Sequence, residues 1–201
     1  MIRADLHIHT TYSDDSTVTP KALVEKLATH SSIKVAAVTD HDTVKGLNET
    51  RKLAAAYPDI LIIPGVEIST TEGDILVLGA EETPTHPWTV ENVLDFARDN
   101  EYVSVVAHPY REYGMGEAAK NYRFDAIEVL NGESSPHANK MARELAKTMR
   151  LPGIAGSDAH NPSEPLTVYT EIQVGLNLEE ILKAIKKGLV TTHSATRSIR
   201  F

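Results

Sequence analysis

Short apolar segments alternate with amphipathic helical patterns along the whole chain of 201 residues, and this alternation constrains the fold more than any other sequence feature. The apolar segments are too short, and too rich in β-branched residues or bounding glycines, to be helices, so they are predicted to form strands. They occupy residues 2–9, 33–41, 59–69, 73–80, 102–109, 124–132, 151–160, 168–175 and 189–193.

Helices are predicted between these segments from their caps and from apolar spacing. Thr19-Pro20 and Ser135-Pro136 pair a capping hydroxyl with proline at the first helical position, and Thr89 is a third capping hydroxyl. A weaker pattern at residues 46–57 is stopped by Pro58. The last helix is predicted to start at Asn177, with Glu180 completing a capping-box-like pattern, and to end at Gly188.

If seven or eight of these nine segments are strands of one sheet, then with six or fewer helices they favour an α/β architecture with a largely parallel sheet, and a small, irregular (β/α) barrel more than an open sheet. The length suits one core, so residues 1–201 are expected to form a single domain. No apolar stretch approaches the roughly 20 residues of a membrane span, and Asp5 and His7 interrupt any signal-peptide pattern, so a cytoplasmic protein without membrane contact is expected.

Charge and cysteine content exclude several functional classes. A formal net charge of −8 argues against strong, sequence-independent binding of nucleic acid, which needs a basic surface. Without cysteine, the chain has no disulfide, thiolate zinc site or cysteine nucleophile. Any metal must therefore be held by nitrogen and oxygen atoms.

Polar side chains gather where the predicted strands end. The opening pair, His7 and His9, is two residues apart, so a strand would point both imidazoles, together with Asp5, to one face. Further candidates lie at the carboxyl ends of predicted strands or in the loops after them, which is the face where parallel α/β barrels carry their active sites. They are Asp14, just beyond the first strand, and His41, Glu67, His108, Asp158 and His160.

Each of these residues has a structural alternative, such as a capping histidine or a surface acid. Their joint placement changes the interpretation, because several histidines and carboxylates in one partly dry pocket are hard to satisfy without cations. The sequence therefore predicts a metal cluster.

The motifs DLHIHTTYSDDS, VAAVTDHDT, PGVEIS, VVAHP, IEVLNG and GSDAH resemble, in this order, those of the PHP domain, the polymerase-and-histidinol-phosphatase superfamily of metal-dependent phosphoesterases. The resemblance covers nearly the whole chain. It implies a distorted (β/α)7 barrel with two or three divalent ions at the carboxyl ends of the strands.

The resemblance also implies a ligand set. One ion would be held by His7, His9, Glu67 and Asp158, a second by Asp14, His41 and His160, and a third by His108 with Glu67 as a bridge. Many family members carry a further histidine on the strand after the GVE motif, where this chain has Leu76 or a neighbour. The third ion is therefore expected to bind weakly or to recruit Glu128 or Asn131.

Other residues receive supporting roles. Asp40 and Asp42 are expected to orient ligands, Arg111 to clamp a phosphate, and His193 to contact substrate. His30, His86 and His137 are expected to lie outside the site.

A multinuclear site of nitrogen and oxygen ligands suits Zn²⁺, Mn²⁺ or Fe²⁺. The expected activity is hydrolysis of a small phosphate ester, such as a phosphorylated metabolite, nucleotide or short oligonucleotide, by a metal-bound hydroxide, with Glu67, His108 and Asp158 as catalytic residues. Two alternatives stay open: an amidohydrolase-like C–N hydrolase, and a non-catalytic, metal-stabilised module that acts through a partner. Substitution of His41 separates enzyme from module, because it should abolish activity in the first and stability in the second.

Overall fold

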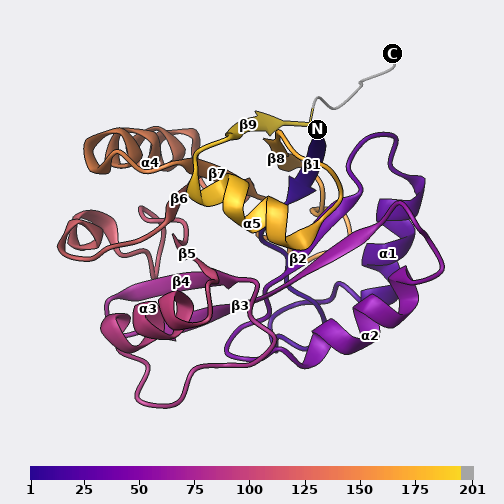
Figure 1. Cartoon of the computed structure of the whole chain (residues 1–201), viewed down its shortest axis with the longest axis horizontal. Coiled ribbons are helices and arrows are strands. Elements are labelled where there is room, and N and C mark those ends of the chain that lie inside the picture. Colours follow the sequence, from indigo (N-terminus) through magenta and orange to yellow (C-terminus); the bar gives the residue numbers. More distant parts are fainter. Residues whose placement is uncertain (196–201) are drawn as a thin grey trace.

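The computed structural model describes residues 1–195 and contains a mixed α/β fold built on one curved sheet (Figure 1). Within the described residues, the sheet has nine strands in the order β7-β6-β5-β4-β3-β2-β1-β8-β9. The strands are β1 (Ile2–Asp5), β2 (Val35–Val38), β3 (Leu61–Thr70), β4 (Gly73–Leu78), β5 (Val103–Val106), β6 (Ala126–Asn131), β7 (Gly153–Gly156), β8 (Val168–Ile172) and β9 (Val190–Ser194).

The five predicted helices are present, together with a short 3-10 helix. They are α1 (Pro20–Thr29), α2 (Lys45–Ala54), α3 (Val90–Asp99), η1 (Gly116–Asn121), α4 (Pro136–Met149) and α5 (Leu178–Lys186). The predicted caps form as hydrogen bonds: Thr19 accepts from the Ala22 amide at 3.1 Å, and Ser135, Thr89 and Asn177 cap their helices in the same way.

The barrel prediction is confirmed, because the sheet curls until the β7 end meets the chain that follows β1. Backbone hydrogen bonds join the chain after β1 to β7 and the chain after it, from Leu6 to Ala155 at 3.4 Å, from Asp158 to His7 at 2.7 Å and from His9 to Ala159 at 3.1 Å. The chain segments that carry the opening histidines and Asp158 are thereby held side by side.

Two strands depart from the expected parallel arrangement. β4 is antiparallel to both β3 and β5, and β8 is antiparallel to both β1 and β9. β3 and β4 are joined by a two-residue turn, and such a short connection forces neighbouring strands to run in opposite directions. The amino end of β4 therefore lies beside the carboxyl end of β3.

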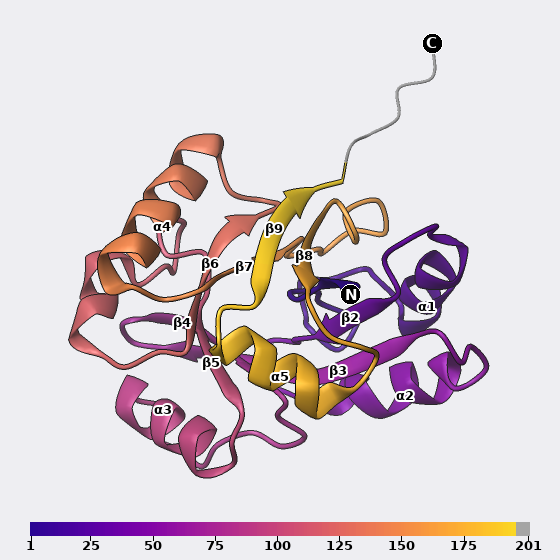
Figure 2. The same ribbon diagram turned by 45° about the horizontal axis from the view of Figure 1, so that its top comes forward.

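Helices cover the sheet on two sides and close one end. In both ribbon views α1 and α2 lie on one side, α3 and α4 on the other, and α5 between them (Figures 1 and 2). Ile181, Ala184 and Ile185 of α5 join a buried cluster drawn from strands all around the sheet, so α5 closes the end at which the parallel strands begin. Functional side chains are left to gather at the opposite end.

None of the helices in residues 1–195 combines the length and the apolar character needed to span a bilayer.

Candidate metal centre

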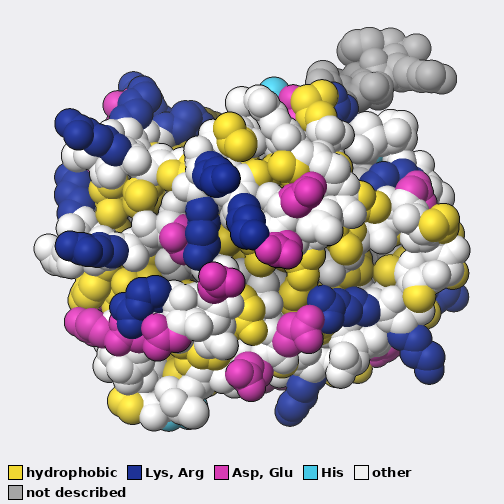
Figure 3. All heavy atoms as spheres, in the orientation of Figure 1, with side chains coloured by type: hydrophobic (Ala, Val, Ile, Leu, Met, Phe, Trp, Pro, Cys, Tyr) yellow, Lys and Arg dark blue, Asp and Glu magenta, His cyan; other side chains and the backbone are white. Residues whose placement is uncertain are grey.

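A cavity of about 400 Å³ opens at the carboxyl ends of the parallel strands. Its walls combine histidines, carboxylates, one arginine and one tyrosine: Asp15, His41, Ser69, Thr70, Asp74, His108, Arg111, Glu112, Tyr113, Asp158 and His160. The face that carries α5 shows almost no histidine side chains, so the histidine cluster does not open there (Figure 3).

The first group of possible metal ligands is His7, His9, Glu67 and Asp158, each of which offers an atom within 4.8 Å of the others. All four side chains are buried. Nε2 of His7 lies 3.1 Å from Oε2 of Glu67, and Nε2 of His9 lies 3.2 Å from Oδ1 of Asp158. The opening histidines thus point at the same pair of carboxylates.

Asp5 does not share this site, although strand alternation placed it on the same face as His7. The regular strand ends at Asp5, so the alternation stops there. The buried Asp5 carboxylate instead accepts hydrogen bonds from the backbone amides of Ser157 and Leu166, both at 2.8 Å. Asp5 ties the opening segment to the chain around β7.

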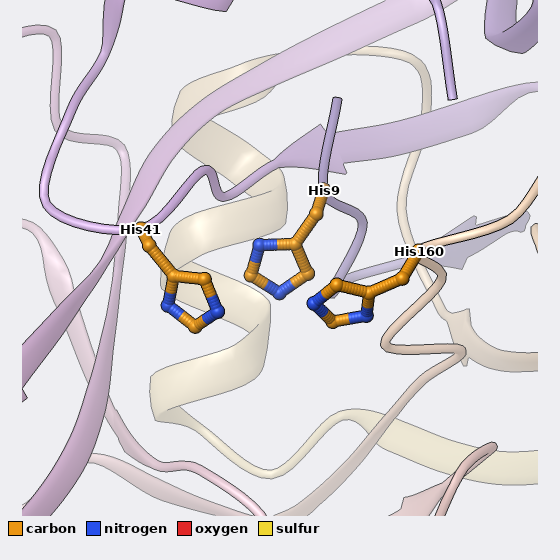
Figure 4. Close-up of side chains that lie close together, drawn as sticks. All are labelled: His9, His41 and His160. Carbon is orange, nitrogen blue, oxygen red and sulfur yellow. The ribbon is translucent and has the colours of Figure 1, made fainter. Parts of the chain in front are cut away.

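The second group consists of His9, His41 and His160. Their rings come from three separate segments and lie side by side (Figure 4). The ring centroid of His9 is 4.3 Å from that of His41 and 4.2 Å from that of His160.

Asp15 accompanies this second group instead of the expected Asp14. Its Oδ2 lies 3.5 Å from Nε2 of His41 and 3.3 Å from Nε2 of His160. Asp14 is exposed and does not appear among the described residues that line the cavity. The two aspartates are adjacent in a turn, where strand alternation gives no rule for choosing between them.

The third group is Glu67, Asp74 and His108. Nε2 of His108 lies 2.9 Å from Oε1 of Glu67 and 3.9 Å from Oδ2 of Asp74. The sequence does not point to Asp74 as a ligand, because ligands are expected at the carboxyl ends of parallel strands. In the antiparallel β4, the amino end reaches the cavity, and Asp74 is the second residue of that strand.

Glu128 and Asn131 hold ligands in place. Glu128 accepts from the His108 amide at 2.8 Å, and its other oxygen lies 3.0 Å from Nδ1 of His7. Asn131 donates to Asp158 at 3.1 Å and to Glu128 at 3.0 Å. A carboxylate on Nδ1 fixes the tautomer of His7 and leaves Nε2 free to bind an ion.

Asp40 and Asp42 accept hydrogen bonds from residues near the possible metal ligands. Asp40 accepts a hydrogen bond from Ser13 at 3.1 Å, and the Ser13 hydroxyl lies 3.2 Å from Nδ1 of His9. Asp42 accepts from the Ser69 amide at 2.9 Å. Asp40 therefore acts on the orientation of His9 through one serine.

The pKa values reflect a crowded, buried set of charges. Burial alone would raise the pKa of Glu67, but His7 and hydrogen bonds from the neighbouring histidines outweigh it and hold that pKa well below its usual range. Burial would lower the pKa of His7, yet Asp158 and Glu67 raise it well above the usual value. For Asp74, burial and the nearby Glu67 carboxylate raise the pKa to about 7.

Several nitrogen atoms in the centre are better placed to bind cations than to form hydrogen bonds with one another. The Nε2 atoms of His7 and His9 lie only 3.0 Å apart. Within residues 1–195, buried Nδ1 of His41 and buried Nδ1 of His108 have no hydrogen-bond partner. Buried polar atoms are normally paired, so these nitrogens and the converging carboxylates form a donor set suited to divalent ions.

Of the two predicted substrate contacts, Arg111 lines the cavity and His193 does not. Arg111 lines the cavity, pairs with Asp158 and lies 3.3 Å from Oδ1 of Asn131. His193 lies on β9, where its ring stacks on Tyr169 with centroids 5.2 Å apart, and it is not among the described residues that line the cavity. The last strand is at the edge of the sheet and pairs with β8.

Three other histidines lie elsewhere, as expected. His30 follows α1, His86 stacks on Trp88 with centroids 3.9 Å apart, and His137 is exposed on α4.

Comparisons with known proteins agree with this fold. A family model for the PHP-associated region matches residues 136–190. Uncharacterized protein MJ1587 of Methanocaldococcus jannaschii is 32% identical over 142 residues, which are 65% of this chain and 82% of that protein. The 5′-3′ exoribonuclease Rnm of Escherichia coli is 39% identical over 186 residues, which are 85% of this chain and 60% of that protein.

Among solved structures, a two-domain protein of Bacteroides vulgatus that contains a predicted PHP-like metal-dependent phosphoesterase matches with a TM-score of 0.80. The sequences are 19% identical, and the match covers 96% of this chain and 64% of that one. This chain thus spans less than two thirds of the length of the Escherichia coli exoribonuclease and of the Bacteroides protein. From the matched family model, these relatives and the shared fold, the chain belongs to the PHP family.

Proposed function

We propose that the protein hydrolyses small phosphate esters at this centre with two or three divalent ions, Zn²⁺, Mn²⁺ or Fe²⁺. The observation that carries the proposal is the sharing of ligands: Glu67 belongs to the first and third groups, and His9 to the first and second. Groups that share ligands would hold neighbouring ions, and neighbouring ions can stabilise both the attacking and the leaving oxygen of a phosphoryl transfer.

The ligand assignment follows from the three groups. His7, His9, Glu67 and Asp158 would hold one ion, His41 and His160 with His9 and Asp15 a second, and Glu67, Asp74 and His108 a third. Ions bound there would supply an activated water and neutralise phosphate oxygens. Nitrogen and oxygen ligands without thiolate suit Zn²⁺, Mn²⁺ and Fe²⁺.

The protein's own side chains position the substrate and the ligands. Arg111 stands at the wall of the cavity beside Asp158, where its planar guanidinium can bind two phosphate oxygens. Glu128 fixes His7, and Asp40 fixes His9 through Ser13. Glu67, Asp158 and His108 belong to the ligand groups that would hold the ions, which supports their assignment as catalytic residues.

The substrate range proposed here includes nucleotides and short oligonucleotides. The relative named as a 5′-3′ exoribonuclease supports this range, because it is 39% identical over most of the present chain. A net charge of −8 favours a short substrate held at the centre over a long nucleic acid held by surface charge.

The test is phosphate release by the metal-loaded protein from a panel of nucleoside monophosphates, sugar phosphates and oligonucleotides, with metal content measured on the same sample. His41→Ala is expected to lower activity at least a hundredfold while the fold is retained. His86→Ala, remote from the cavity, is the matched control. Equal activity of the metal-free and metal-loaded protein would contradict the proposal, and so would a His41 variant that unfolds before it loses activity, which is the behaviour of a structural metal site.

A further inference from the structure

The loop between β5 and η1, residues 107–115, forms one wall of the cavity and is tightly folded. The Arg111 amide donates to the His108 carbonyl at 2.9 Å, the Gly114 amide to the Arg111 carbonyl at 3.0 Å, and the Gly116 amide to the Pro109 carbonyl at 2.8 Å. A Cβ atom at Gly114 would lie 2.5 Å from the His108 carbonyl oxygen, so only glycine fits this close turn. The loop therefore presents its side chains from a fixed backbone.

Tyr113 lies at the rim of the cavity on this loop. Tyr113 is among the residues that line the cavity, yet it is 74% exposed. Its carbonyl accepts a hydrogen bond from the Asp74 amide at 2.9 Å, which anchors Tyr113 directly beside the third ligand group. A large aromatic ring held at an open rim adds little to the core and gains most from covering another flat apolar surface.

The backbone of Tyr113 is held in an unfavourable conformation. Its φ is 62°, in the left-handed region that bulky residues rarely adopt. Such conformations persist where the surrounding structure enforces them, and they gather at functional sites. In this loop the hydrogen bond from Asp74 and the turn at Gly114 enforce it.

Arg111 and Tyr113 are two positions apart on one fixed loop, and they offer different chemistry to one ligand. Arg111 pairs with Asp158 next to the metal ligands, where a phosphate would lie, whereas Tyr113 borders the same cavity at its open rim. A ligand that fills both positions needs a phosphate at one end and a flat aromatic group at the other. A nucleoside phosphate has this composition.

We propose that Tyr113 is a stacking platform for the nucleobase of the substrate, and that it makes this centre prefer nucleotides over sugar phosphates that lack a base. The inference rests on the proposed phosphoesterase function and adds the group that determines specificity. Stacking of a base on an aromatic side chain contributes about 1–3 kcal/mol, or roughly 5- to 150-fold in affinity.

The test uses 2-aminopurine riboside 5′-monophosphate, whose fluorescence is quenched when its base stacks. The probe is mixed rapidly with the metal-loaded full chain and its fluorescence is read before it is hydrolysed, and ribose 5-phosphate, which shares the sugar and phosphate, is used as competitor. Wild-type protein is expected to quench the probe and to bind it at least fivefold more tightly than ribose 5-phosphate. Tyr113→Leu should lose both the quenching and the preference, whereas Tyr113→Phe should keep both.

Two control comparisons separate the effect of the ring from other effects. Leu and Phe suffer the same backbone penalty as Tyr at positive φ, so a difference between these two variants reports the ring. Tyr57→Leu, at a half-exposed tyrosine remote from the cavity, should behave as wild type. If Tyr113→Leu keeps the preference, or if wild type binds the two compounds equally, the stacking role is wrong while the phosphoesterase function stands; if wild type neither binds nor hydrolyses either compound, the proposed function fails as well.

Discussion

His7 shows how a single ligand is fixed by its surroundings. Glu128, itself buried, lies 3.0 Å from Nδ1 of His7 and leaves Nε2 facing Glu67 and Asp158. Because partners of this kind set ring orientation and basicity, we expect Glu128→Gln to weaken metal affinity by about 10- to 100-fold. Competition with a chromophoric chelator measures the change.

Glu144→Gln, on the exposed face of α4, is the matched control for that variant. Circular dichroism should show an unchanged fold for both proteins. Wild-type affinity in Glu128→Gln would show that His7 does not depend on this carboxylate.

Asp74 is expected to matter for one ion and not for the others. It belongs to the third ligand group alone, with Glu67 and His108. Asp74→Asn should therefore reduce the number of bound ions by one after dialysis, while the ions held by the other groups remain. Elemental analysis by mass spectrometry gives the count, and a variant with the full wild-type metal content would remove Asp74 from the ligand set.

Some of the possible metal ligands can be identified from the sequence, and others cannot. The opening histidines, Glu67 and Asp158 can be found from the sequence because they sit at predicted strand ends. Asp74 cannot be found by that rule, since its strand runs the other way. The choice between Asp14 and Asp15 depends on the turn, whose path is set by contacts with residues far along the chain, such as the bond from Thr17 to the His160 carbonyl.

At the scale of elements, β7 must pass very close to the opening segment. A Cβ atom at Gly156 would lie 2.2 Å from Cβ of His7 and 2.8 Å from Oε1 of Glu128. We expect Gly156→Ala to lower the free energy of unfolding by about 1–3 kcal/mol, because the added methyl group must push these segments apart. Urea denaturation measures it.

Gly156→Ala should also lose metal affinity, because the added methyl group would displace His7. Gly175→Ala is the control, since the nearest atom to its added Cβ, Oε2 of Glu180, is 4.0 Å away. Equal stability of the two glycine variants would mean that β7 can shift without strain.

The end of α1 supplies a pH-dependent prediction away from the metal centre. Nδ1 of His30 accepts hydrogen bonds from the amides of Ser32 at 3.2 Å and Ile33 at 2.9 Å. Burial and the charges of Lys34 and Lys26 lower the pKa of His30 below its ordinary value of 6.5. The neutral ring therefore stabilises the fold above pH 6.5, and this stabilisation is lost as the pH falls toward the folded-state pKa.

His30→Ala is accordingly expected to cost about 1 kcal/mol at pH 8, the value of an ordinary hydrogen bond, and much less at pH 5. Chemical denaturation at the two pH values checks the sign. His137→Ala, at an exposed histidine of α4, should show no such difference. A cost for His30→Ala that grows toward acid pH would be the opposite of this expectation.

Helix starts can be predicted from local sequence, whereas strand directions cannot. Helix starts are local, because a capping side chain and its partner amide are three residues apart, and the predicted caps form accordingly. Strand direction is not local in the same way. An apolar run reads the same for a parallel and an antiparallel strand, so β4 and β8 could be predicted as strands but not oriented.

At the scale of the whole molecule, removal of metal is expected to destabilise the fold. The centre joins segments from both halves of the chain through like-charged carboxylates and crowded imidazoles. An ion present at a thousand times its dissociation constant stabilises the folded state by about 4 kcal/mol. Chelation should therefore lower the melting temperature by on the order of 10 °C, as calorimetry can measure.

Restoring Mn²⁺ or Zn²⁺ after chelation should return the melting temperature. A protein with His41→Ala should show a smaller loss on chelation, because it begins with a weakened second group. A melting temperature that is indifferent to chelation in wild type would contradict a centre that binds metal.

The barrel itself follows from the order of elements, but its closure does not. Alternating strands and helices predict a parallel α/β barrel, and the sheet curls as expected. The closing contacts join residues about 150 positions apart, such as His7 with Asp158, and no local pattern specifies such a pair.

The placement of β1 in the sheet has a consequence for biosynthesis. The strand that leads to the first two histidines lies between β2 and β8, and the Asp5 carboxylate binds the Ser157 amide 152 positions later. During translation, a ribosome therefore releases His7 and His9 long before it has made the segment that completes their surroundings. Until residues 157–172 have emerged, the nascent chain has an unfinished barrel and lacks Asp158 and His160, so the complete centre can form only after that segment has been made.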